Sequence, residues 1–249
     1  MITLAGIFSA PIKSFALMPH NEAYVGFKGI PSDRRFYVID SNGALLTQRD
    51  CTRLTLIKSE FHDSRNELSI RFPDGSKISA EPVLGGKIAT KLWGRRFNGH
   101  IIDGDWNHAI SEFCGFQVRL VKSEFEGSCY DEYPLSILSK GSARSLETEG
   151  FQSIDIRRFR PSILLDGLNP LDENAWVGAL ISIGDDVVVK VEVKDPRCSI
   201  ISNNPDDGLQ DVDMVSRLKA ATSDIYLGVY GLVVKPGRIA VGDNIVVNV

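Results

Sequence analysis

The chain has 249 residues, of which 43% are hydrophobic and 24% are charged, with a net charge of −4 and a pI of about 5.6. This composition excludes a disordered chain and leaves room for one large β-rich domain or two smaller ones. Because proteins dedicated to nucleic acid carry a strongly basic surface, we expect no nucleic-acid partner.

The four cysteines, Cys51, Cys114, Cys129 and Cys198, are scattered and form no CxxC pair. This pattern speaks against a zinc ribbon or a thioredoxin-type site and indicates free thiols in a reducing compartment. No apolar run approaches the ~20 residues that a membrane helix needs. The N-terminus also lacks the basic region of a signal peptide. We therefore expect a cytoplasmic protein without a membrane segment.

The first half of the chain consists mainly of runs with the period-two alternation of β-strands. Asn-Gly and Asp-Gly supply the positive φ angles that tight hairpin turns need. Hairpins are therefore predicted within 34–48, around Ser41-Asn42-Gly43, and within 67–81, around Pro73-Asp74-Gly75. Further strands are predicted within 86–103 and 116–124.

Residues 105–115 interrupt this alternation. Apolar residues recur there at helical spacing from Trp106 to Phe113, and Gly115 can end a helix. A short helix is therefore predicted between the strands of the first half.

The second half of the chain repeats the same mixture of strands and short helices. The predicted elements are a strand and a short helix within 134–150, a strand within 159–167, a hairpin within 179–195 around Gly184-Asp185, a helix within 211–222, and closing strands within 225–249 joined by Pro236-Gly237. The stretches ISIGDDVVV and IAVGDNIVV look alike, and we interpret them as two similar hairpin turns rather than as a domain repeat.

Many short strands with few helices favour a mainly β (α+β) fold built from barrel-like sheets. The polar, turn-rich stretch SEFEGSCYDEYP begins at Ser123 and is typical of a domain boundary. We predict a first β-barrel-like domain over residues 1–122 and a second β-barrel domain with a few short helices over 123–249.

Several common catalytic signatures are missing from the sequence. There is no GxGxxG, GxxxxGK[ST], GxSxG or HExxH motif, and the four histidines show no metal-ligand spacing. The stretch NNPDDG lacks the spaced oxygen ligands of a calcium loop, so we interpret it as a solvated turn.

Three basic stretches each lie at the end or the start of a predicted strand. PIKS holds Lys13 and Ser14, SDRRFYVID holds Arg34 and Arg35, and DIRRFRPSILLDG holds Arg160 together with two other arginines. Arginine forks and hydroxyl groups at strand ends suit a phosphate or another oxyanion. The alternative is that these residues solvate loop edges and pair with nearby aspartates, and the pattern leaves both interpretations open.

Cys198 lies in KDPRCSIISNN, where an alternating apolar run ends, and it directly follows Arg197. Nearby positive charge lowers the pKa of a thiol and favours a thiolate ligand or nucleophile. A small buried hydrophobe is the alternative interpretation of such a cysteine.

Taken in order, DIRRFRPSILLDG, WVGALISIGD, DPRCSIISNNPDDG and GVYGLVVKPGRIAVGD resemble a MOSC domain. In the first half, PIKS, DRRFYVID, LLTQRD and LWG resemble the N-terminal β-barrel domain that precedes MOSC in the amidoxime-reducing branch of this family. The resemblance covers nearly the whole chain, and the specificity lies in the order of the C-terminal motifs rather than in any one of them.

The resemblance implies a molybdenum cofactor (molybdopterin) bound between the two domains. By motif position, Cys198 would be both the metal ligand and the catalytic residue. The implied cofactor-binding residues are Lys13, Ser14, Arg34, Arg35, Arg160, Ser162 and Arg197. The other three cysteines fall outside the matching motifs, and we interpret them as structural.

The resemblance further implies an oxidoreductase that reduces small N-hydroxylated compounds. Its electrons would come from a separate donor protein, a flavin reductase acting through a small iron–sulfur or haem carrier. The alternatives are a carrier of the molybdenum cofactor or of sulfur without turnover, and an interaction domain that no longer binds the cofactor. Ser162 and Pro196 depart from the family pattern, which often has asparagine and a small polar residue there.

Overall fold

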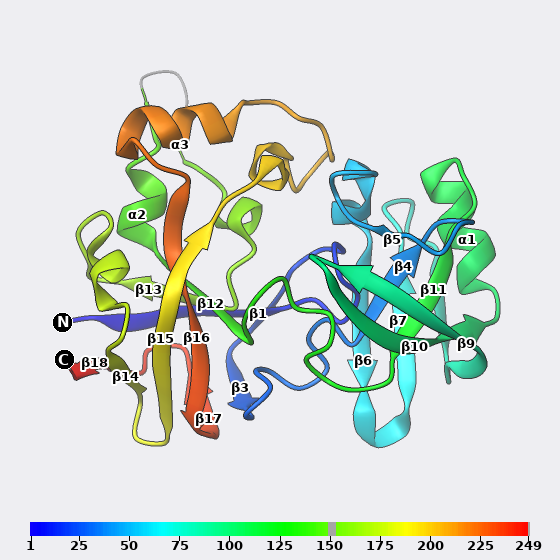
Figure 1. The fold of residues 1–249 in the computed structure, drawn as a ribbon, viewed down its shortest axis with the longest axis horizontal. Coiled ribbons are helices and arrows are strands. Elements are labelled where there is room, and N and C mark those ends of the chain that lie inside the picture. Colours follow the sequence, from blue (N-terminus) through cyan, green and yellow to red (C-terminus); the bar gives the residue numbers. More distant parts are fainter. Residues whose placement is uncertain (149–152, 249) are drawn as a thin grey trace.

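The computed structural model describes residues 1–148 and 153–248, and within them the chain forms two lobes of mainly β-structure (Figure 1). The lobe that holds both termini is built on an eight-stranded sheet. In spatial order its strands are β18 (Ile245–Asn248), β14 (Leu180–Ile183), β15 (Val187–Pro196), β16 (Tyr226–Lys235), β12 (Leu135–Ser139), β13 (Ile163–Asp166), β1 (Thr3–Ser9) and β2 (Met18–His20).

The second lobe contains a five-stranded sheet and a three-stranded sheet (Figure 1). The strands of the first are, in spatial order, β5 (Leu45–Leu46), β4 (Phe36–Ile39), β11 (Arg119–Ser123), β10 (Arg95–Asp103) and β9 (Val83–Leu92), and those of the second are β6 (Lys58–His62), β7 (Glu67–Arg71) and β8 (Lys77–Ala80). Helix α1 (Trp106–Cys114) packs Trp106 and Ile110 into the core of this lobe.

The remaining elements are short and lie mainly around the eight-stranded sheet. They are α2 (Lys140–Arg144), α3 (Met214–Thr222), a two-stranded sheet of β17 (Gly237–Ala240) and β3 (Glu22–Val25), and the 3-10 helices η1 (Thr52–Leu56), η2 (Asp63–Arg65), η3 (Ile156–Phe159), η4 (Asp172–Trp176) and η5 (Ser199–Ser202). Within the described ranges, no helix is long and apolar enough to cross a membrane.

Alternating side chains fix the face of each long strand. Along β15, Val187, Val189 and Val191 point into the core, while Lys190 is exposed. A period-two pattern of this kind buries one face of a strand and leaves the other in water. The turn before β15 contains Gly184 at φ 58, as the predicted hairpin requires.

The fold class is confirmed: the chain is mainly β, with a few short helices. The helices predicted within 105–115 and 211–222 form, as do the hairpins within 34–48, 67–81 and 179–195. The helix predicted within 134–150 covers only Lys140–Arg144, and residues 149 and 150 lie outside the described part. Neither of the two larger sheets closes on itself by strand pairing among the residues described.

One predicted hairpin is wrong. The stretch IAVGDNIVV contains β17 and β18, but these strands do not pair with each other. β17 pairs with β3, and β18 pairs with β14, so the turn at Gly242 leads from one sheet to another. The local pattern predicted the turn correctly, but the hydrogen-bond partners of the two strands come from distant parts of the chain.

The predicted division into residues 1–122 and 123–249 stays a prediction. β1 and β2 belong to the same sheet as the strands of the second half, so the N-terminal segment contributes to both lobes. β1 pairs antiparallel with β13, and this pairing determines which loops meet near the boundary between the lobes.

Candidate functional site

A cavity of about 680 Å³ is lined by residues of both halves of the chain. From the first half it receives Arg34, Arg49, Trp93 and Arg95. From the second half it receives residues of the segment 130–136, of the loop that contains η3, of the end of β15, and of β16. A concave site of this size with several convergent polar groups is the usual form of a small-molecule site.

Strand pairing explains why distant motifs meet here. Because β1 and β13 are antiparallel, the end of β1 lies beside the start of β13, and the backbone N–H of Phe8 donates to the carbonyl of Ser162 at 2.9 Å. β12 runs parallel to β13, so its start lies at the same edge, where the N–H of Ser162 donates to the carbonyl of Ser136 at 2.8 Å. The PIKS and FRPS motifs are therefore placed at one edge of the eight-stranded sheet.

Two arginines form the cationic side of the cavity. Arg34 forms an ion pair with the buried Asp33, and one of its N–H groups points toward the carbonyl of Arg160 at 3.5 Å. The Nη2 atom of Arg160 is shielded from solvent and has no hydrogen-bond partner among the described residues. Burial, together with the charge of Arg34, lowers the pKa of Arg160 to about 9. Arg160 therefore lacks a hydrogen-bond acceptor at this point, and a negatively charged acceptor would suit it best.

Backbone strain is concentrated in the same region. Nine of the described residues other than glycine have positive φ angles, and three of them, Arg34 (φ 52), Trp93 (φ 49) and Arg160 (φ 52), line the cavity. Each such conformation costs on the order of 1–3 kcal/mol and persists only where the surrounding structure enforces it. The cavity walls are therefore held in place by packing and hydrogen bonds around them.

Arg197 and Asp195 lie on a buried wall of the cavity. Arg197 pairs with Asp195 at 3.0 Å, donates from Nε and Nη2 to the carbonyl of Leu227 at 2.7 and 2.5 Å, and donates from Nη1 to the carbonyl of Phe159 at 2.7 Å. Burial raises the pKa of Asp195 to about 6, although Arg197 opposes this shift. Gly228 makes room for the arginine, because a Cβ there would lie 3.2 Å from Nη2 of Arg197 and 2.5 Å from the carbonyl oxygen of Ile137.

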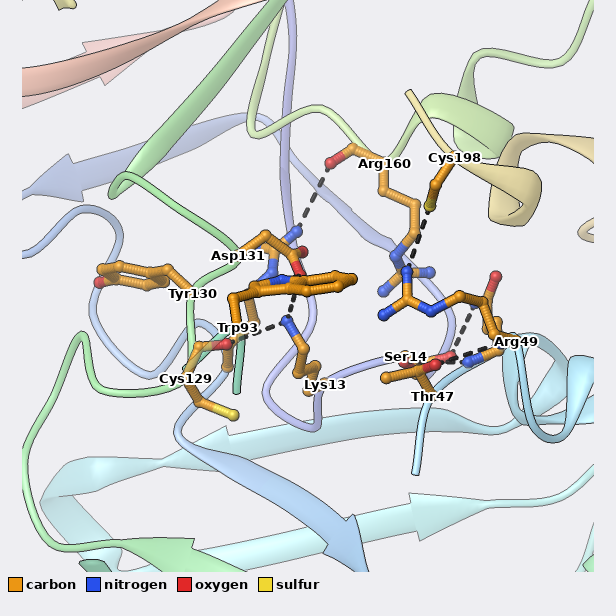
Figure 2. A network of polar contacts seen from close by, with 12 residues as sticks. Lys13, Ser14, Thr47, Arg49, Trp93, Cys129, Tyr130, Asp131, Arg160 and Cys198 are labelled. Carbon is orange, nitrogen blue, oxygen red and sulfur yellow. Dashed lines mark hydrogen bonds and ion pairs between the residues drawn. The ribbon is translucent and has the colours of Figure 1, made fainter. Parts of the chain in front are cut away.

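Cys198 is exposed at the mouth of the cavity, where β15 has ended (Figure 2). Its Sγ accepts a hydrogen bond of 3.2 Å from Nη1 of Arg49. The guanidinium of Arg49 lies 4.7 Å from the centre of the Trp93 ring. The cation beside the thiol is thus Arg49, whereas the neighbour in sequence, Arg197, points toward backbone carbonyls on the other side.

Lys13 and Ser14 are buried just behind the cavity wall (Figure 2). Lys13 donates to the carbonyl of Cys129 at 3.1 Å and pairs with Asp131, a residue of the lining, at 3.0 Å. The Ser14 hydroxyl accepts from the backbone N–H of Gln48 at 3.3 Å. Both residues border the cavity without lining it.

The predicted site residues are thus only partly brought together. Five of them, Arg34, Arg160, Ser162, Arg197 and Cys198, line the cavity. Arg35 does not line it, and its guanidinium instead donates to the carbonyl of Ser123 at 2.5 Å. Among the described residues, no group of three His, Cys, Asp or Glu side chains could hold a metal ion by itself.

Sequence reasoning missed Arg49, Trp93 and Asp195 as cavity residues. Arg49 and Trp93 lie within LLTQRD and LWG, two stretches that carried the family resemblance, so a signal was present in the sequence. Asp195 immediately precedes Pro196, which marks a departure from the family pattern. Cys51, Cys114 and Cys129 do not line the cavity.

Comparison with known proteins gives the same family for both halves of the chain. Residues 122–246 match the MOSC domain, and residues 1–115 match the MOSC N-terminal beta barrel domain. Human mitochondrial amidoxime reducing component 2 is 28% identical over 98% of this chain and 82% of its own length. The mouse mitochondrial amidoxime-reducing component 1 is 24% identical over 98% of this chain and 81% of its own length.

A second group of relatives covers less of the chain. The molybdenum cofactor sulfurase of Drosophila melanogaster is 28% identical over 73% of this chain, which corresponds to 25% of the sulfurase. Together with the two matched domains, these similarities show that the chain belongs to the MOSC family, with a MOSC N-terminal beta barrel domain preceding its MOSC domain.

Proposed function

We propose that this protein binds a molybdenum cofactor and reduces small N-hydroxylated compounds. The observation that supports it most directly is a pair of features in the lining of one cavity. Arg160 offers a buried N–H group that has no acceptor among the described residues, and Cys198 offers an accessible thiol. A molybdopterin has a phosphate at one end and dithiolene sulfur near the metal, so both of its ends would find suitable partners.

The residues of the chain would hold the cofactor by different means. Cys198 would supply a thiolate ligand to the metal. Arg160, Arg34 and Ser162 would donate to the phosphate, with Lys13 and Ser14 supporting that wall from behind. Arg35 would need to leave Ser123 before it could take part.

The cofactor, when bound, would supply the two-electron chemistry of the reaction. Reduction of an N–OH group takes up two electrons and two protons and yields N–H and water. The chain carries no dinucleotide-binding fingerprint, so we propose that the electrons come from a separate donor protein, such as a flavin reductase with a small iron–sulfur or haem carrier.

Molybdenum content and turnover together test this function. The protein is to be purified from cells that make the cofactor and from a cofactor-deficient strain, and its molybdenum measured per chain. The loaded protein should reduce benzamidoxime with reduced viologen and should be inactive with NADH alone. Full loading without turnover under any reductant would favour a carrier of the cofactor or of sulfur, a possibility that the similarity to sulfurases supports. Absence of molybdenum would refute both.

A further inference from the structure

An exposed tryptophan with a hydrogen-bonded ring nitrogen lines the mouth of the cavity. Trp93 is 62% exposed and has a φ of 49 in the turn between β9 and β10. Its Nε1 donates to Asp131 at 3.3 Å. Arg95, two residues later, donates to the carbonyls of Tyr130 and Asp131 at 2.6 and 2.7 Å. These bonds fix the tip of the hairpin against the opposite side of the cavity.

Arg49 lies against this tryptophan with most of its hydrogen-bonding capacity unused. The guanidinium carbon lies 4.7 Å from the centre of the Trp93 ring, and among the described residues only Nη1 has an acceptor, the Cys198 sulfur. A guanidinium has five N–H donors. In the described part of the chain, no carboxylate lies within ion-pair distance of Arg49.

The other cations of the cavity are already engaged. Its lining contains six arginines and three carboxylates, so positive charge is in excess. Arg34, Arg158 and Arg197 pair with Asp33, Asp211 and Asp195, Arg95 donates to backbone carbonyls, and Arg160 is the proposed phosphate ligand. Arg49 is therefore the arginine of the lining that keeps the most N–H donors available near the exposed Cys198.

We infer that Arg49 and Trp93 form an anion-binding subsite at the mouth, which selects planar N-hydroxylated substrates that carry a carboxylate. A guanidinium that lies over an aromatic ring keeps its remaining N–H donors available, and its planar fork matches the two oxygens of a carboxylate. The ring offers a flat apolar wall to a conjugated substrate. This inference deepens the proposed function and rests on it for the identity of the reacting group.

The test compares two substrates that differ only in charge. Benzamidoxime is neutral, and 4-carboxybenzamidoxime carries a carboxylate on the same ring. With the molybdenum-loaded protein and reduced viologen, the wild type should have the higher kcat/KM for the carboxylated compound. Arg49→Gln should lower the ratio of the two kcat/KM values at least about tenfold, as expected for loss of a charged hydrogen bond, and mainly through KM.

Arg53 provides a matched control for the loss of charge. It lies in η1, four residues from Arg49, and its guanidinium also stacks on an aromatic ring, that of Phe113 at 4.3 Å, but it does not line the cavity. Arg53→Gln should leave the substrate ratio unchanged. Trp93→Leu should weaken binding of both compounds, because it removes the shared aromatic wall.

A binding measurement separates this inference from the proposed function. Calorimetric titration of the oxidised protein with each compound, without reductant, should show the same loss of preference in Arg49→Gln. Turnover of both compounds with no preference in the wild type, or with an unchanged ratio in Arg49→Gln, would overturn the subsite and leave the function intact. A preference in binding that depends on Arg49, without turnover of either compound, would uphold the subsite and refute the reductase function.

Discussion

Arg160 combines a strained backbone, a lowered pKa and a buried N–H without a partner among the described residues. A buried donor without an acceptor destabilises the folded state by about 1–3 kcal/mol. Its position beside Arg34 adds repulsion between like charges. At the scale of the residue, a bound anion would therefore satisfy the Arg160 donor and reduce the repulsion between Arg160 and Arg34.

Replacement of Arg160 should separate stability from cofactor binding. In cofactor-free protein, Arg160→Met should raise the free energy of unfolding by roughly 1–2 kcal/mol, because an unsatisfied buried donor is removed. The same variant should retain less molybdenum. Urea denaturation and metal analysis measure the two effects. Arg35→Met is the control. The Arg35 guanidinium already donates a hydrogen bond to the carbonyl of Ser123, so its removal should give no gain in stability. A cofactor-free Arg160→Met that is less stable than wild type would contradict the prediction.

A second prediction at this scale concerns Cys198. Because it is exposed at the cavity mouth, Cys198→Ala should fold with wild-type stability and lose most of its molybdenum. The partly buried Cys114 lies outside the cavity, so Cys114→Ala should keep the metal. Metal analysis of purified variants checks both. Full molybdenum occupancy in Cys198→Ala would exclude this cysteine as the ligand.

At the scale of the elements, the pairing of β1 with its two neighbours organises the site. β13 brings the arginine-containing loop to the end of β1, and β2 packs along its other edge. His20 on β2 receives a hydrogen bond from, or donates one to, the Ser9 hydroxyl, at 2.7 Å between Oγ and Nε2. This contact links β2, the outermost strand of the eight-stranded sheet, to β1.

His20 should make the stability of this edge depend on pH. Burial lowers the pKa of His20 below its usual value, and Asp33 and Glu60 oppose the shift. Above about pH 7 the imidazole is neutral in both states. As the pH falls below about 6.5, the unfolded chain binds a proton that the folded chain does not, so stability is lost. Urea denaturation at pH 7.5 and 5.5 should show a smaller loss for His20→Gln than for the wild type. An equal loss in both would refute this role of His20.

At the scale of the whole molecule, the cavity draws its walls from both halves of the chain. A ligand that binds there contacts parts of the protein that only the folded state brings together. Such a ligand stabilises the protein by mass action, by about 2.7 kcal/mol when its free concentration is 100 times its Kd.

The cofactor should therefore raise the Tm of the whole chain by several degrees. Differential scanning calorimetry of protein from cofactor-competent and cofactor-deficient cells measures the shift. The increase should shrink in Arg160→Met, which weakens retention. Identical Tm values for loaded and cofactor-free protein would show that the cofactor does not stabilise the folded state.

The sequence by itself determined the class of fold and many of its elements. Period-two alternation predicted the hairpins at Asn42-Gly43, Asp74-Gly75 and Gly184-Asp185 correctly, and helical spacing with Gly115 predicted α1. These signals are local, because a strand face, a turn and a helix end each depend on a few neighbouring residues. The motifs also indicated the family.

Only the tertiary structure decided which elements meet. β17 and β18 look like a hairpin in sequence but pair with β3 and β14. Arg34, with its left-handed backbone, reaches the cavity, while the adjacent Arg35 donates to Ser123. Arg49 lies beside Cys198 although 149 residues separate them. Such contacts depend on long-range packing and strand pairing, which no local pattern encodes.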